Sequence, residues 1–116
     1  MSETPETPTA TIEKKSRTII ARPMRKMAEE HDLKAMIRLI DEAAGSDISL
    51  VIVDLSHVTI LPSLGLGLLV QISNKCKARQ QKLKIAGVIP QIRQVFAITR
   101  LDRMFEFVPS ADAAVE

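Results

Sequence analysis

The stretch LVIVDLSHVTILPSLGLGLLV, residues 50–70, contains the features that decide the fold. Its first six residues form a nearly continuous apolar, β-branched run, which is typical of a strand buried on both faces of a sheet. The corner PSLGLG follows, and apolar residues at helical spacing then lead into a polar helix face. We therefore predict a central strand over residues 50–55 and a helix that begins at Ser63 and ends near Gln80.

Strand and helix signals alternate on either side of this stretch. TATIE and RTIIA predict a hairpin whose polar turn is Lys14, Lys15 and Ser16. Helical spacing predicts a helix over residues 31–44, with Asp32 as a capping residue and Gly45 as the stop. The remaining expected elements are a strand over residues 83–88, a helix over residues 90–99, a strand over residues 105–108 and the start of a fourth helix in SADAAVE.

This order, with helices crossing between strands, is typical of an α/β fold that contains parallel strand pairs. A chain of 116 residues suits one folded domain with a single core. Residues 1–10 are rich in Pro, Thr and Glu and are predicted to form a disordered tail. The folded domain is then expected to span residues 11–116.

Composition argues against several classes of protein. The net charge is only +2 and the basic residues are interleaved with acidic ones, so direct binding to nucleic acid is not expected. No apolar run approaches the roughly 20 residues of a membrane span, and the first residues are acidic where a signal peptide would be basic. Cys76 is the only cysteine, which excludes an internal disulfide and a thiolate zinc site. These features predict a cytoplasmic protein.

Catalytic and cofactor signals are weak. His31 and His57 have no metal ligand at a suitable spacing, so no metal or other cofactor is expected. Ser63 and His57 lack the GxSxG context and an Asp to orient the imidazole, and LGLGL lacks the third glycine of a dinucleotide fingerprint. An enzyme is therefore not expected. We interpret His57 as a polar residue that closes the strand, and Asp54 as one that caps a turn or faces a cleft.

Ser63 and the two glycines after it have more than one interpretation. As an N-cap, the Ser63 hydroxyl would accept a backbone N–H and contribute about 1 kcal/mol. As a phosphorylation site, it would place about −2 charge at a helix amino terminus, where unpaired N–H groups and the helix dipole stabilise a phosphate. The glycines are explained by close packing of the first helical turn on the sheet.

A family resemblance adds to these observations. DLSHVTILPSLGLGLLV resembles the signature of the STAS family, whose bacterial regulatory members are anti-sigma factor antagonists and usually read DLS-x-V-x-F-x-D-S-S-G-L-G. AGVIPQIRQVFAITRLDRMFEFV is similar to the later segment of that family, and the likeness covers about residues 17–108. It implies a single domain with a mixed four- to five-stranded sheet, helices packed mainly on one face, and no catalysis.

The resemblance also implies a phosphorylation switch. The family's acceptor serine corresponds to Ser63, and the partner that phosphorylates it is both a serine kinase and an anti-sigma factor. The unphosphorylated domain binds this kinase and releases the sigma factor, and phosphorylation abolishes that binding. The implied partner surface consists of His57, Thr59, Pro62, Ser63, Leu64, Gly65 and Gly67.

Three departures from the family pattern favour a different function. Pro62 replaces the family Asp, Leu64 replaces the second Ser, and Arg100 replaces a Gly, while residues 24–27 replace a GELD-like stretch. The alternative is a non-switching scaffold or an accessory subunit of a signalling assembly or transporter, with Ser63 only a cap. The sequence identifies neither the sigma factor nor the kinase, and it leaves the oligomeric state open.

Overall fold

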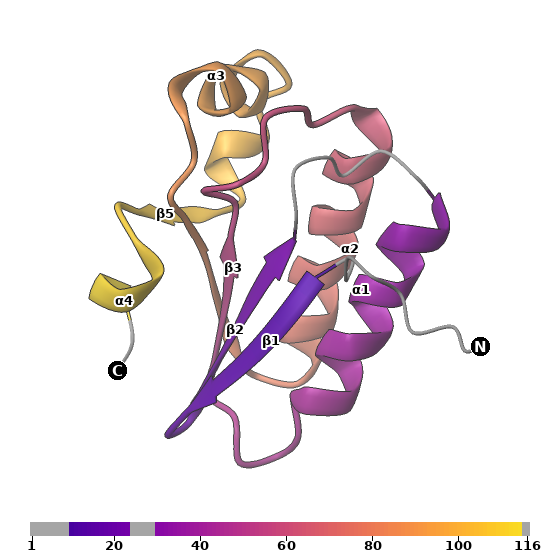
Figure 1. Cartoon of the computed structure of the whole chain (residues 1–116), viewed down its shortest axis with the longest axis vertical. Coiled ribbons are helices and arrows are strands. Elements are labelled where there is room, and N and C mark those ends of the chain that lie inside the picture. Colours follow the sequence, from indigo (N-terminus) through magenta and orange to yellow (C-terminus); the bar gives the residue numbers. More distant parts are fainter. Residues whose placement is uncertain (1–9, 24–29, 115–116) are drawn as a thin grey trace, which may run out of the picture.

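The computed structural model describes residues 10–23 and 30–114, which form a mixed sheet with helices on both of its faces (Figure 1). The strands are β1 (Ala10–Lys15), β2 (Thr18–Pro23), β3 (Leu50–Asp54), β4 (Lys82–Ala86) and β5 (Glu106–Val108). The helices are α1 (Glu30–Ala43), α2 (Ser63–Ala78), α3 (Pro90–Ile98), the 3-10 helix η1 (Leu101–Arg103) and α4 (Ala111–Ala114).

The sheet has five strands in the order β1-β2-β3-β4-β5. Only β1 and β2 are antiparallel; the other three neighbouring pairs are parallel and are joined by crossover helices. All five residues of the central strand β3 are buried, because elements cover both faces of the sheet. The predicted α/β class, mixed sheet and central strand are therefore confirmed.

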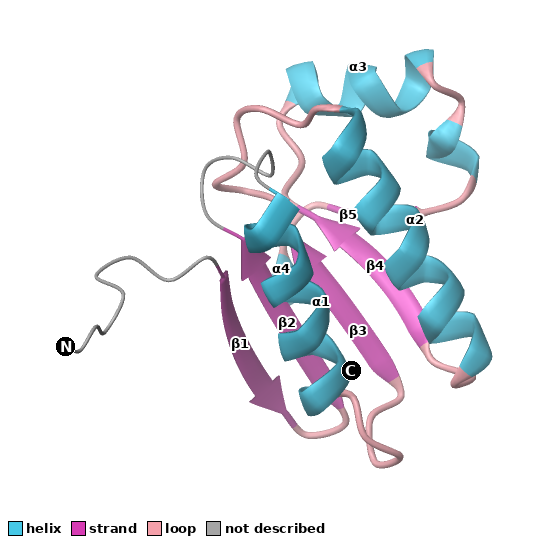
Figure 2. Cartoon of the chain, turned by 90° about the vertical axis from the view of Figure 1, so that its right-hand side faces the viewer, coloured by secondary structure: helices cyan, strands magenta, loops and turns pink. Residues whose placement is uncertain are grey.

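The two faces of the sheet differ in what covers them. Figure 2 shows α1 and α2 lying side by side across one face, where Ile19, Val51 and Ile85 point into the main core. The opposite face has a smaller core around Ile20 and Ile52, on which the short helix α4 packs. Since α4 has only four residues, the helices lie mainly on one face, as predicted.

Aromatic contacts hold α3 and η1 at the end of the sheet from which α2 begins (Figure 1). Phe96 of α3 is fully buried and packs edge-to-face on Phe105 and Phe107, with ring centroids 5.6 Å and 5.1 Å apart. Arg93 lies over the Phe107 ring at 3.9 Å, which adds a cation–π contact. This cluster joins α3 to β5.

The predicted hairpin turn was wrong in its position. Lys14 and Lys15 are the last residues of β1, where they pair with Ile19 and Thr18. The connection is the two-residue turn Ser16–Arg17, and Ser16 has a positive φ of 57°. Such a turn matches the right-handed twist of paired strands, so the strands extend further than the polar composition indicated.

Other predicted boundaries lie within two residues of the observed ones. Asp32 is not the cap of α1, because the helix begins at Glu30 and Asp32 lies in its first turn. Nearly all of the expected tail, residues 1–9, falls outside the described residues, as do residues 24–27 and the side chain of His31. The proposed division into tail and domain stays a prediction.

Candidate functional site

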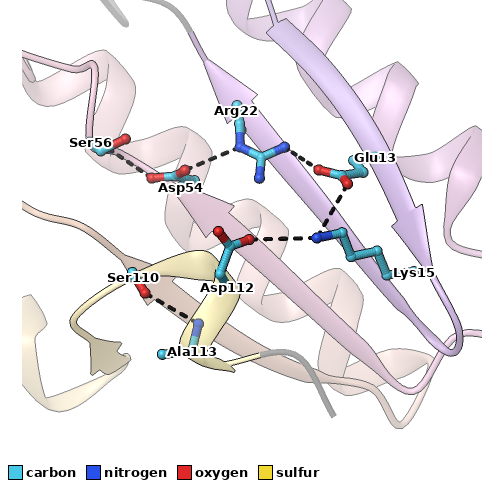
Figure 3. A network of polar contacts seen from close by, with 8 residues as sticks. All are labelled: Glu13, Lys15, Arg22, Asp54, Ser56, Ser110, Asp112 and Ala113. Carbon is cyan, nitrogen blue, oxygen red and sulfur yellow. Dashed lines mark hydrogen bonds and ion pairs between the residues drawn. The ribbon is translucent and has the colours of Figure 1, made fainter.

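The chain leaves β3 through a turn that Asp54 organises. One carboxylate oxygen, Oδ1, accepts the Ser56 backbone N–H at 3.0 Å, and the other, Oδ2, accepts a hydrogen bond from Arg22 Nε at 3.2 Å (Figure 3). Asp54 also lines a cavity of about 130 Å³ that Gly87 and Ser110 border. Asp54 therefore both caps a turn and faces a cleft, as the sequence predicted.

A network of charged side chains extends from Asp54 across the sheet (Figure 3). Arg22 also donates to Glu13 at 2.6 Å, and Lys15 lies 3.4 Å from Glu13 and 3.5 Å from Asp112. The hydrogen bond from Arg22 lowers the pKa of Glu13, and Glu13 in turn raises the pKa of Arg22. Sequence reasoning missed this network, although opposite charges at alternating strand positions were a signal for it.

Ser63 is the first residue of α2 and is not its N-cap. Pro62 occupies the cap position with φ −77° and ψ 176°, and no side chain caps the helix. Proline suits this place because its ring already restricts φ to about −65°. The Ser63 side chain is exposed, and its hydroxyl has no hydrogen-bond partner within the part of the chain that the structure describes. The N-cap interpretation was therefore wrong.

The other sequence-predicted site residues differ in exposure. His57, Thr59, Leu64 and Gly67 are exposed, whereas Pro62 is half-buried and Gly65 is buried. His57 lies three residues beyond the end of β3, so it does not close the strand. Leu64 is 48% exposed and Ile60, which the sequence analysis did not single out, is 47% exposed.

Gly67 does not serve the close packing that the sequence suggested. A Cβ built at Gly67 meets no atom within 4 Å, so the glycine opens space at the surface instead of allowing a close approach. Ser63, Leu64 and Gly67 border the same groove between α1 and α2, which has a volume of about 380 Å³. The groove is lined by Leu33, Lys34, Ile37, Ser63, Leu64, Gly67, Leu68 and Gln71.

Beyond this groove, ion pairs join α1 and α2. Asp41 accepts hydrogen bonds from Lys75 at 3.2 Å and from Arg79 at 2.6 Å. Burial alone would raise the pKa of Asp41, but the hydrogen bonds from Arg79 and Lys75 hold it below the ordinary value. We call this contact the Asp41 clamp. It lies one helical turn beyond Ile37 on α1 and beyond Gln71 on α2.

Two further searches concern the described residues only. No three His, Cys, Asp or Glu side chains among residues 10–23 and 30–114 are grouped so that they could hold a metal ion. In those same ranges, no helix has the length and apolar character required to cross a membrane.

Comparison with known proteins identifies the family. The model of the STAS domain matches residues 11–114, so the chain belongs to the STAS domain family. Among curated proteins, no sequence matches it.

Solved structures of low sequence identity share the fold. An anti-sigma factor antagonist from Mycobacterium paratuberculosis is 21% identical, with a TM-score of 0.77 and coverage of 97% of this chain and 95% of that one. The phosphorylated form of the Bacillus cell fate determinant SpoIIAA is 17% identical, with a TM-score of 0.69 and coverage of 90% and 95%. A serine-to-glutamate variant of RsbS from Moorella thermoacetica is 15% identical, with a TM-score of 0.73 and coverage of 92% and 91%.

Proposed function

We propose that the chain is an anti-sigma factor antagonist-like regulatory binding domain that a partner serine kinase switches by phosphorylating Ser63. The observation that carries the proposal is the placement of Ser63 in a STAS domain, exposed at the first position of the 16-residue helix α2. The kinase is itself the anti-sigma factor. The domain is not assigned a catalytic step of its own, and it acts in the cytoplasm.

The surroundings of Ser63 favour a phosphate chemically. No acidic residue lies in the first turn of α2, so no carboxylate of that turn would repel the new charge. The exposed hydroxyl is open to a kinase, and its phosphate would carry about −2 charge and three acceptor oxygens. That charge would lie beside Leu64, an apolar side chain that is half exposed. Phosphorylation therefore replaces an apolar binding surface with a charged one.

The proposed contact surface for the kinase is the loop from β3 to α2 together with the first turns of α2. His57, Thr59 and Leu64 present exposed side chains there, while Gly65 contributes from a buried position. Leu64 exposes a large apolar area without an intramolecular reason, which is typical of interaction surfaces. Leu64→Glu should therefore weaken binding of the kinase and leave the fold intact.

A non-switching scaffold or accessory subunit is the second candidate. Pro62 and Leu64 favour it, because they remove the carboxylate and the second hydroxyl that flank the acceptor in the family pattern. In that case partners would bind the same surface, and Ser63 would remain unmodified.

Phosphorylation in vitro separates the two candidates. The purified chain is incubated with ATP and a serine kinase of the histidine-kinase-like ATPase fold that a neighbouring gene encodes, and phosphate is located by mass spectrometry. We expect one phosphate on Ser63, none on Ser63→Ala, and an unchanged yield on Thr59→Ala, which removes an exposed hydroxyl of the same loop. Ser63→Asp should bind the kinase more weakly than Ser63→Ala. Phosphate on Thr59 instead, or equal affinity of the two Ser63 variants, would favour the scaffold.

A further inference from the structure

We propose that the groove between α1 and α2 is the docking site for an amphipathic helix of a protein partner that carries a carboxylate beside its apolar face. This inference rests on the proposed function, because it specifies what the partner places against the Ser63 surface. We call this feature the α1–α2 groove; its lining combines Leu33 and Ile37 from α1 with Leu64 and Leu68 from α2.

The shape of the α1–α2 groove fits a short helix. Along α2 the lining extends from Ser63 to Gln71, which corresponds to about 12 Å of helix axis at about 1.5 Å per residue. A partner helix could lay about two turns along this length and place apolar side chains at positions i, i+3 or i+4, and i+7. The volume of about 380 Å³ leaves space for those side chains.

Gly67 creates much of that space. Because a Cβ at this position would meet nothing within 4 Å, a larger residue there would extend into the α1–α2 groove and not into the core. A glycine inside a helix costs roughly 0.5–1 kcal/mol relative to alanine. The helix therefore forgoes stability at the position where a side chain would obstruct the groove.

The Asp41 clamp explains why the groove ends where it does. Lys75 and Arg79 draw the two helices together through Asp41, one turn beyond Ile37 and Gln71. On the Ser63 side, Leu33 and Leu64 leave an apolar opening instead. The groove is thus open toward the candidate phosphorylation site.

Charge decides which helix would fit. Among the described residues that line the groove, Lys34 is the only charged one, and the first turn of α2 carries no acidic side chain. A carboxylate on the partner helix would be attracted to Lys34, whereas a lysine would be repelled. A phosphate on Ser63 would compete with that carboxylate, since Ser63 and Lys34 line the same groove. Phosphorylation would then release the helix.

Selection from a phage-displayed library of 16-residue peptides tests this chemistry without a known partner. The wild-type chain should enrich peptides with apolar residues at helical spacing and an Asp or Glu beside them. Affinities of synthetic copies are then measured for variants of the chain. Gly67→Phe, which fills the groove, and Lys34→Glu, which reverses its charge, should each weaken binding by roughly tenfold or more. Ala78→Phe adds the same ring at an exposed position at the far end of α2 and should leave affinity unchanged.

Each result decides the inference or the switch. Selected peptides that bind Gly67→Phe and wild type equally, or an enrichment of basic peptides, would overturn the docking site. Lys34→Glu keeps the test valid if Gly67→Phe fails to fold, because Lys34 is an exposed residue. Ser63→Asp reports the switch separately. If this variant binds the peptides as wild type does while Gly67→Phe does not, the docking site stands and the proposed phosphorylation switch fails.

Discussion

The two ends of helix α2 are built in opposite ways. At its carboxyl end, Asp41 binds Lys75 and Arg79, and Gln81 donates to three backbone carbonyls of the α1–β3 connection. At its amino end, no side chain caps the helix, and Leu64 exposes almost half of its surface. The contacts that stabilise α2 therefore lie away from Ser63. A change of charge at Ser63 can then alter binding while the fold persists.

The largest effect is expected midway between these ends. Leu69 is fully buried against the sheet, so Leu69→Asp would place an unpaired charge in the core and should abolish cooperative thermal unfolding. Leu64→Asp makes the same chemical change at the open end and should retain a cooperative transition. Circular dichroism during heating compares the two. A cooperative transition in Leu69→Asp would contradict the observed orientation of α2.

Gln81 offers a test of the closed end. Its Nε2 donates to the carbonyls of Ala44, Gly45 and Ile48 at 3.4, 3.3 and 3.1 Å, and the residue is 8% exposed. Gln81→Leu leaves these carbonyls without that donor and should lower the free energy of unfolding by about 2 kcal/mol.

Urea denaturation measures this loss, and Gln71→Leu is the matched control. Gln71 is exposed at the open end, so its substitution should change the free energy of unfolding by less than about 0.5 kcal/mol. Equal losses for the two variants would mean that the two ends of α2 do not differ in stability.

The sequence predicted one of these two ends better than the other. The strand, corner and start of α2 were predictable because they depend on local apolar spacing and on breakers such as Pro62. The roles of Asp54 followed for the same reason. The α1 wall of the groove was not predictable, since Leu33 and Ile37 meet α2 only through tertiary packing. The Asp41 clamp joins residues 34 and 38 positions apart, and no local pattern indicates such a pair.

Two errors at the open end have a local cause. Ser63 looked like an N-cap by residue type, but the backbone of Pro62 already adopts the extended cap conformation one residue earlier. Gly67 looked like a packing glycine, but it lies on the exposed side of α2, where a Cβ has open space. Which side of a helix a glycine occupies depends on the helix orientation. Composition alone does not contain that information.

Acid should weaken the closed end selectively. The pKa of Asp41 is lowered in the folded chain from the ordinary value of 3.8. Its contribution to stability is therefore complete above the unfolded-state pKa and is lost as pH falls through the lower folded-state pKa. Asp41→Asn should lower the free energy of unfolding by roughly 0.5–1 kcal/mol at neutral pH.

Chemical denaturation at several pH values measures this effect. Between about pH 5 and about pH 2, the wild type should lose more stability than Asp41→Asn, because other carboxylates titrate in both proteins. Parallel pH curves for the two proteins would show that the Asp41 clamp contributes nothing to acid sensitivity.

The smallest effect is expected at Ser63 itself. Since the Ser63 hydroxyl makes no cap bond, Ser63→Ala should change the free energy of unfolding by less than about 0.5 kcal/mol. Ser110 is the positive control, because its hydroxyl accepts the Ala113 N–H at 3.2 Å. Ser110→Ala should cost about 0.5–1 kcal/mol in the same urea titration. A larger loss for Ser63→Ala than for Ser110→Ala would restore a structural role for Ser63. Near-neutrality would instead leave its exposed hydroxyl free for the kinase, since its removal changes binding chemistry without changing the fold.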